Sequence, residues 1–181
     1  MRRLFTGIAV DSAQLPTLRS SVAALRAAHP GLRWSDQAGW HLTLQFYGMV
    51  DEAREQQLRE QLRSVEAGAL NLAVQGMGTF ERAGVLWAGV APSMELQELH
   101  RSVVAVGTAC GFDTEERPYR PHITLARRKG RGIRGDLPKD AELDAMRKFG
   151  SFVASEFVLY ESVAGPEGSR YEVRDRYPLR R

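Results

Sequence analysis

Apolar residues recur along the chain with two spacings, one typical of strands and one of helices. Alternating or short continuous apolar stretches predict strands over residues 2–10, 32–34, 40–47, 70–74, 85–90, 121–126, 155–163 and 171–177. Apolar residues three or four apart predict one helix that ends at His29-Pro30-Gly31, one capped by Asp51 that runs through Glu66, and one that begins at Pro92-Ser93. A fourth, short helix is predicted over residues 138–148.

The order of these elements indicates the fold class. Strands separated by helices, with a hairpin formed by the last two strands, favour an α+β fold built on antiparallel or mixed sheets. Neither a Gly-x-Gly-x-x-Gly motif nor a Walker loop argues for a parallel doubly wound sheet. A chain of 181 residues suits one domain over residues 1–181, with room for two similar lobes.

Composition narrows the class of protein further. With 43% hydrophobic and 26% charged residues, the chain lies in the ordinary globular range, which excludes disordered, collagen-like and disulfide-scaffold proteins. The one cysteine, Cys110, permits no internal disulfide. No apolar stretch approaches the roughly 20 residues of a membrane span, and Asp11 interrupts the apolar start too early for a signal peptide. We therefore expect a cytoplasmic protein that does not bind membranes.

The positive charge is concentrated in one segment. Lys and Arg exceed Asp and Glu by only three, and genome composition explains the excess of Arg over Lys better than function does. Residues 117–135, however, hold seven basic side chains and no acid: Arg117, Arg120, Arg127, Arg128, Lys129, Arg131 and Arg134. This segment, which includes a Gly-rich loop over residues 130–135, is expected to attract anions such as an RNA backbone.

A four-residue pattern of His, aliphatic, Thr and Leu occurs twice, from His41 to Leu44 and from His122 to Leu125. Both copies lie in predicted strands, where His and Thr share one face and the aliphatic residues occupy the other. One neutral imidazole accepts a proton from water while a protonated one donates to a leaving oxygen, and the hydroxyls of Thr43 and Thr124 bind non-bridging oxygens. This chemistry suits phosphoester cleavage without a metal.

Three segments carry a resemblance to a known family: HLTLQFYG at residues 41–48, VLWAGV at 85–90 and YRPHITLAR at 119–127. They resemble the two-histidine (2H) phosphoesterase superfamily and, within it, the LigT-like RNA 2′,3′-cyclic phosphodiesterases, also called 2′-5′ RNA ligases. The resemblance implies a bilobal, pseudo-two-fold α+β fold in which two antiparallel sheets line a cleft, helices lie outside, and no metal or other cofactor is needed. It makes His41 and His122 catalytic and assigns phosphate binding to Thr43, Thr124 and Arg127.

Strand geometry complicates the choice of the phosphate-binding arginine. Simple alternation places Arg120 on the face of His122 and Thr124, but Arg127 on the opposite face. Arg127 then reaches the cleft only if the strand twists or ends near Ala126. Both arginines are therefore retained as candidates, Arg127 from the resemblance and Arg120 from alternation.

The predicted function is hydrolysis of RNA 2′,3′-cyclic phosphate ends to 2′-phosphates, with 2′-5′ ligation as the reverse reaction. The resemblance implies His122 as base and His41 as acid, an order that the near-symmetric motifs leave open. We expect a monomer that needs no protein partner. The alternatives are a relative acting on small cyclic nucleotides or 2′-5′ oligonucleotides, and a non-catalytic module that binds RNA ends. For Phe5, Trp34, Trp40 and Trp87, core packing is favoured over stacking on a base.

Overall fold

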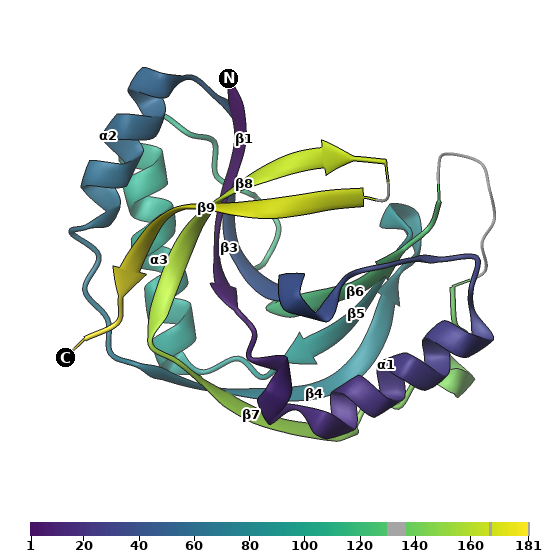
Figure 1. Cartoon of the computed structure of the whole chain (residues 1–181). Helices are drawn as coiled ribbons and strands as arrows, with labels where there is room; N and C mark the ends of the chain where they lie inside the picture. The colour runs from purple at the N-terminus through teal and green to yellow at the C-terminus, as the bar shows by residue number, and fades with distance from the viewer. Residues whose placement is uncertain (130–136, 167, 181) are drawn as a thin grey trace.

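The structure is a computed structural model that describes residues 1–129, 137–166 and 168–180. Its described residues form a nine-stranded sheet and three α-helices (Figure 1). The helices are α1 (Pro16–Ala28), α2 (Glu52–Leu62) and α3 (Met94–Ala109). The strands are β1 (Arg2–Ala9), β2 (Arg33–Trp34), β3 (His41–Val50), β4 (Leu70–Phe80), β5 (Val85–Val90), β6 (His122–Arg127), β7 (Lys148–Ala154), β8 (Glu156–Gly165) and β9 (Gly168–Pro178).

The central pair of strands divides the main path of the sheet into two halves of four strands each. The strand order of the sheet is β7-β4-β5-β6-β3-β1-β8-β9, and β2 pairs with β6. Neighbouring strands are antiparallel, and β6 and β3, the central pair, meet at one backbone pair, Leu42 with Ile123. The predicted α+β class and the antiparallel pairing are thus confirmed, but the two predicted sheets are one continuous sheet among the described residues, joined at that pair.

Helices cover the outside of both halves. Helix α3 packs on β3, where Gly107 lies against the Gln45 side chain, and α2 packs on α3. Helix α1 packs on β7 of the other half, as its position in Figure 1 shows. The buried Glu55 carboxylate ties α2 to the sheet through Arg2 and Arg174, at 2.8 and 2.9 Å. In the described part of the chain, no helix is both long and apolar enough to cross a membrane.

Most predicted elements are present, and the predicted cap Asp51 and the predicted helix start at Pro92-Ser93 are confirmed. The Asp51 side chain accepts a hydrogen bond from the Arg54 amide at 2.9 Å, and Ser93 accepts one from Leu96 at 3.1 Å. Helix α2 ends at Leu62, four residues before the predicted end. The strand predicted over residues 40–47 continues to Val50, because Gly48 adopts a φ of 70° beside a bulge instead of ending the strand.

The predicted short helix over residues 138–148 is wrong. Only a single 3₁₀ turn forms there, Asp140–Glu142, and the chain then enters β7, a strand that the sequence did not predict. Phe149 and Phe152 of β7 are buried against the core, and the strand pairs with β4. This long-range pairing outweighs the local helical spacing.

Candidate active site

The two motifs meet at the centre of the sheet because β3 and β6 are its central strands. His41 and His122 are the first residues of these strands, next to the pair that joins the halves. Leu42 and Ile123 are fully buried and anchor the motifs, whereas both histidines, Thr43 and Thr124 are half-buried on the other face. The predicted alternation within each motif is confirmed.

Each histidine is oriented by the same backbone contact. The Nδ1 atom of His41 lies 2.9 Å from the Gly39 carbonyl oxygen, and that of His122 lies 2.7 Å from the Arg120 carbonyl oxygen. A carbonyl oxygen only accepts, so Nδ1 carries the proton in both rings. The neutral tautomer therefore has its lone pair on Nε2, the atom left for substrate or water.

Burial lowers the pKa of both histidines below the ordinary value of 6.5, since it disfavours the charged ring. The positive charge of Arg127 lowers both further, and His122 also lowers the pKa of His41. The hydrogen bonds to the backbone carbonyls oppose this shift. At neutral pH both rings are therefore largely uncharged, and either can act as a base.

A β-bulge follows the His-x-Thr sequence in both strands. On β3, Thr43 pairs with Gly7 and Gln45 with Thr6, so Leu44 is an extra residue. On β6, Thr124 pairs with Trp87 and Ala126 with Leu86, so the extra residue is Leu125. The bulge thus occupies the same position in both motifs and reverses the alternation beyond it.

This bulge changes the face on which Arg127 is expected to lie. Leu125 and Ala126 are both fully buried, and Arg127 after them is exposed. The Arg127 charge acts on both histidines, as expected if its side chain lies on their face. Arg120 precedes β6, and it contacts His122 through its backbone carbonyl. The bulge therefore favours Arg127 over Arg120 as the phosphate-binding arginine.

Two further arginines lie near Arg127 that the sequence did not single out. Arg33 of β2 pairs directly with Arg127 in the sheet. Partial burial lowers the pKa of Arg127, and the charges of Arg33 and Arg3 lower it further, while Tyr171 raises it. Arg3, Arg33 and Arg127 are therefore close enough for their charges to interact, and of the three it is Arg127 whose charge also acts on the histidines.

Aromatic rings hold both histidines in place. The His41 ring packs against Tyr171 at 4.7 Å and Phe5 at 4.9 Å between centroids. The His122 ring lies edge-on to Phe80 at 5.1 Å. Tyr171 lies on the terminal hairpin, and only the fold brings it to His41. Of the aromatic residues considered from the sequence, Trp40 is buried in the core as expected.

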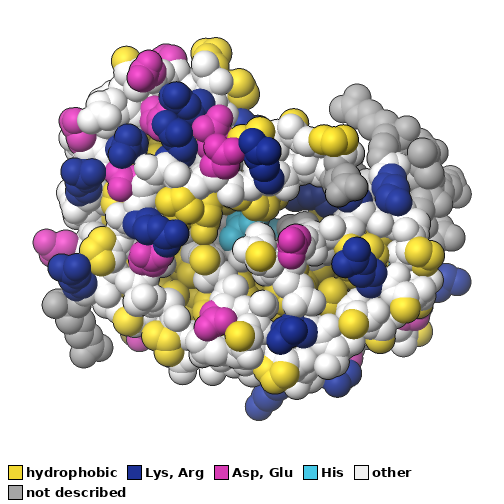
Figure 2. Space-filling view, viewed as in Figure 1, with side chains coloured by type: hydrophobic (Ala, Val, Ile, Leu, Met, Phe, Trp, Pro, Cys, Tyr) yellow, Lys and Arg dark blue, Asp and Glu magenta, His cyan; other side chains and the backbone are white. Residues whose placement is uncertain are grey.

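Acidic partners engage two side chains of the predicted basic segment, residues 117–135. Arg117 forms an ion pair with Glu115 at 2.7 Å, and Arg128 forms one with Glu81 at 2.6 Å. Arg131, Arg134 and the predicted Gly-rich loop lie outside the described residues. Figure 2 shows a histidine at the bottom of a hollow, with hydrophobic side chains beside it and Lys or Arg side chains nearby.

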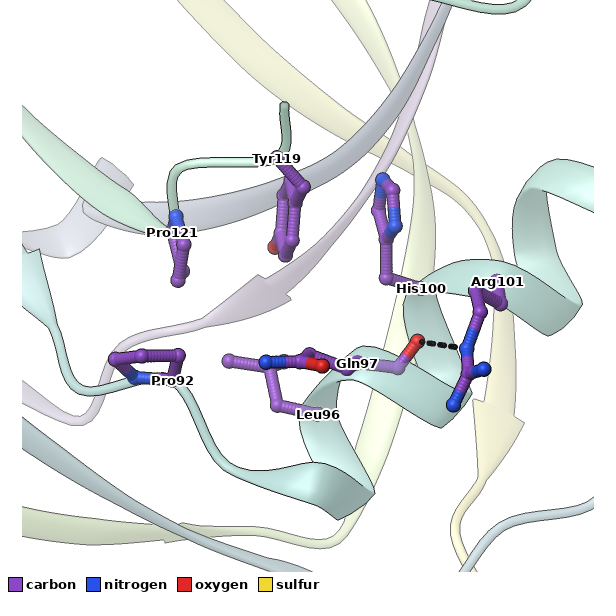
Figure 3. A pocket seen from close by; sticks show the side chains of 7 residues that line it. All are labelled: Pro92, Leu96, Gln97, His100, Arg101, Tyr119 and Pro121. Carbon is purple, nitrogen blue, oxygen red and sulfur yellow. Dashed lines mark hydrogen bonds between the residues drawn. The ribbon is translucent and has the colours of Figure 1, made fainter. Parts of the chain in front are cut away.

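The remaining two histidines lie elsewhere. His29 contacts Glu142 at 2.9 Å. His100 stacks on Tyr119 with 3.7 Å between ring centroids, in a cavity of about 320 Å³ that neither His41 nor His122 lines (Figure 3). The Tyr119 hydroxyl donates a hydrogen bond to the Thr43 carbonyl at 3.0 Å, which links the segment before β6 to β3. Within the described ranges, no three His, Cys, Asp or Glu side chains are grouped to hold a metal.

Comparison with known proteins identifies the family. The model of the 2′-5′ RNA ligase superfamily matches residues 12–166. The chain belongs to the 2′-5′ RNA ligase superfamily. Members similar to it include an RNA 2′,3′-cyclic phosphodiesterase of Aeropyrum pernix, 30% identical over 165 residues, which are 88% of this chain and 91% of the relative. Another, from Geobacillus stearothermophilus, is 33% identical over 83% of this chain, which spans only 48% of that relative.

Solved structures support the same superfamily assignment. Escherichia coli LigT in complex with 3′-AMP superposes with a TM-score of 0.78 at 26% identity, covering 98% of both chains. A structure described as a phosphoesterase superposes with a TM-score of 0.80 at 26% identity, covering 99% of both. The family resemblance seen in the sequence is confirmed.

Proposed function

We propose that this protein hydrolyses 2′,3′-cyclic phosphates at RNA 3′ ends to 2′-phosphates by metal-independent acid-base catalysis. The observation that carries the proposal is the matched orientation of His41 and His122. Both hold Nδ1 on a backbone carbonyl and leave Nε2 for the substrate. The names of the similar superfamily members, RNA 2′,3′-cyclic phosphodiesterases, support the same substrate class.

In the proposed reaction the cyclic phosphate lies between the two imidazoles. Nε2 of His122 takes a proton from water, whose oxygen bonds to phosphorus while the bond from phosphorus to the 3′ oxygen breaks. His41 gives a proton from Nε2 to that oxygen, which leaves a 3′-hydroxyl and a 2′-phosphate. This order follows the family resemblance. With an RNA 5′-hydroxyl in place of water, the same steps form a 2′-5′ linkage. Ligation therefore parallels the hydrolysis and is not its reverse, which corrects the prediction made from the sequence.

The other proposed site residues bind the phosphate. The hydroxyls of Thr43 and Thr124 donate to its non-bridging oxygens, and Arg127 balances its charge. Bound anionic phosphate also favours the protonated form of the acid histidine, whose pKa burial lowers in the free protein. Arg3 and Arg33 are suited to the preceding RNA phosphates. We propose a cytoplasmic monomer of one domain that needs no protein partner.

The test uses an oligonucleotide with a 2′,3′-cyclic phosphate end, in EDTA, with the product phosphate identified. We expect His41→Ala and His122→Ala each to lower kcat about 10²- to 10⁴-fold. His29→Ala is the matched control, because His29 pairs with the exposed Glu142, and we expect it to retain full activity. Full activity of either site variant refutes the mechanism. Binding without turnover in the unmodified protein indicates an RNA-end binding module instead.

A further inference from the structure

One side chain connects the two motifs across the centre of the sheet. The hydroxyl of Tyr119 donates a hydrogen bond to the backbone carbonyl of Thr43, at 3.0 Å. Thr43 belongs to the first motif, whereas Tyr119 lies three residues before His122 of the second. Burial raises the pKa of the Tyr119 phenol, because it disfavours the charged phenolate. The hydroxyl therefore keeps its proton and remains a donor at the pH of any ordinary assay.

This hydrogen bond lies where the two halves of the sheet share little backbone pairing. In the described part of the chain, the pairing of β3 with β6 is confined to Leu42 and Ile123. The segment before β6, residues 112–121, forms neither a helix nor a strand. Its Pro121 carbonyl accepts a hydrogen bond from the Val90 amide at 3.0 Å, which ties the segment to β5 of the same half. The Tyr119 hydroxyl ties the same segment to β3 of the other half.

Tyr119 is also adjacent to the residue that orients His122. The Nδ1 atom of His122 lies 2.7 Å from the carbonyl oxygen of Arg120, which directly follows Tyr119 in the chain. A displacement of Tyr119 therefore moves that carbonyl and turns the imidazole. At its other end the hydrogen bond holds Thr43, two residues after His41. It thus connects the support of one histidine to the strand that carries the other.

His100 of α3 supports the Tyr119 ring. The two rings are parallel within 9°, with 3.7 Å between their centroids. The cavity of about 320 Å³ lies beside this stacked pair, so the Tyr119 ring is not enclosed on every side (Figure 3). Helix α3 itself packs on β3. The stack therefore holds Tyr119 in place relative to β3, as the hydrogen bond to Thr43 does.

We propose that Tyr119 is a positioning residue that fixes the placement of His122 relative to His41, with His100 as its support. This inference rests on the proposed function. Proton transfer from water at one imidazole and to the 3′ oxygen at the other requires both rings to be in place together. Phosphate binding is less demanding, because the hydroxyls of Thr43 and Thr124 rotate to suit their partner. Loss of the Tyr119 hydrogen bond should therefore affect kcat more than KM.

The experiment removes the hydroxyl with Tyr119→Phe, which leaves the ring to stack on His100. We expect kcat for adenosine 2′,3′-cyclic phosphate to fall about 3- to 10-fold, as the loss of one hydrogen bond allows, and KM to change less than about twofold. His100→Ala should lower kcat in the same way, and His100→Phe, which keeps an aromatic stack, should restore it. Tyr177→Phe is the matched control and should retain full kcat, because the Tyr177 hydroxyl donates to the Arg59 carbonyl of α2, at 3.4 Å.

A second comparison separates positioning from a general loss of folded protein. In the His122→Ala background there is no pair of imidazoles to align, so the addition of Tyr119→Phe should lower kcat by less than about twofold. An equal loss in both backgrounds overturns the proposal, because it assigns Tyr119 to the stability of the fold. An unchanged kcat, or a rise in KM alone, also overturns it.

Nuclear magnetic resonance tests the positioning without turnover. At a pH where the His122 ring is neutral, its nitrogen shifts should show the Nδ1-protonated tautomer that the Arg120 carbonyl imposes. Tyr119→Phe should move these shifts toward the average of the two tautomers, and Tyr177→Phe should not. If the unmodified protein hydrolyses no cyclic phosphate but the shifts respond to Tyr119→Phe, the proposed function fails and the positioning stands. Unchanged shifts overturn the positioning, whatever the turnover.

Discussion

Replacing Arg127 by Gln removes one charge from the proposed catalytic site and has two expected effects. A charge-assisted hydrogen bond to phosphate contributes about 1.5–3 kcal/mol. Arg127 is only partly covered and keeps access to solvent, which screens its charge, so we take the lower part of this range. A loss of about 1.5–2 kcal/mol lowers kcat/KM roughly 10- to 30-fold.

The second effect of Arg127→Gln is on pH dependence. The positive charge of Arg127 lowers the pKa of both histidines, so its removal raises both. The proposed reaction requires one protonated and one neutral imidazole, so both limbs of the profile of kcat/KM should move to higher pH. Burial, the largest cause of the lowered pKa values, remains in the variant, which limits the shift.

The assay measures initial rates on adenosine 2′,3′-cyclic phosphate between pH 4.5 and 8. Arg117→Gln is the matched control, because Arg117 pairs with Glu115 in the same basic segment and both side chains are exposed. If Arg127→Gln changes neither the rate nor the two limbs, Arg127 lies outside the cleft and the bulge does not direct it there. An equal loss in Arg117→Gln shows instead that only the general charge of the segment matters.

Two further predictions concern the histidines and their strand. The unmodified protein should show its optimum of kcat/KM below pH 6.5, because burial lowers both histidine pKa values from that figure; an optimum above pH 7 contradicts this. Gly7→Ala should destabilise the protein by about 1–3 kcal/mol in urea unfolding and lower kcat, because the added Cβ would lie 2.8 Å from the Leu42 carbonyl oxygen, beside His41. Gly31→Ala, with open space around it, should change neither stability nor kcat, and equal stability of the two variants would show that β3 adapts.

The sequence predicts the fold where burial follows a local period. Strands β1, β5 and β6 lie within a residue of their predicted bounds, because their apolar residues alternate or run together. Strand β7 was missed because Gly150 and Ser151 interrupt its apolar residues, and Gly150 adopts a φ of 108°. This strand forms because it pairs with β4, which is far away in the sequence, and no local pattern shows that pairing.

In the candidate site too, some residues can be predicted from local spacing and others only from the fold. Local spacing alone identifies His41 and His122 as candidate residues. A strict two-residue period, however, assigns the wrong face to the residues beyond the bulge that follows each Thr. Two adjacent buried residues, Leu125 and Ala126, mark this change of face, and the apolar pair is visible in the sequence. No local pattern marks Tyr171 as a site residue, because it reaches His41 only through the pairing of the terminal hairpin and the order of the strands.

The repeated motifs supply equal groups to a reaction that needs unequal ones. Both histidines have the same tautomer and a lowered pKa, so the motifs themselves do not distinguish acid from base. The difference must arise from their surroundings, which are unlike: Phe46 on one side and Arg127 on the other, at equivalent positions after equivalent bulges. If these two unlike sides bind unlike parts of the substrate, the substrate binds in one orientation only. That orientation decides which imidazole faces the 3′ oxygen and which faces water.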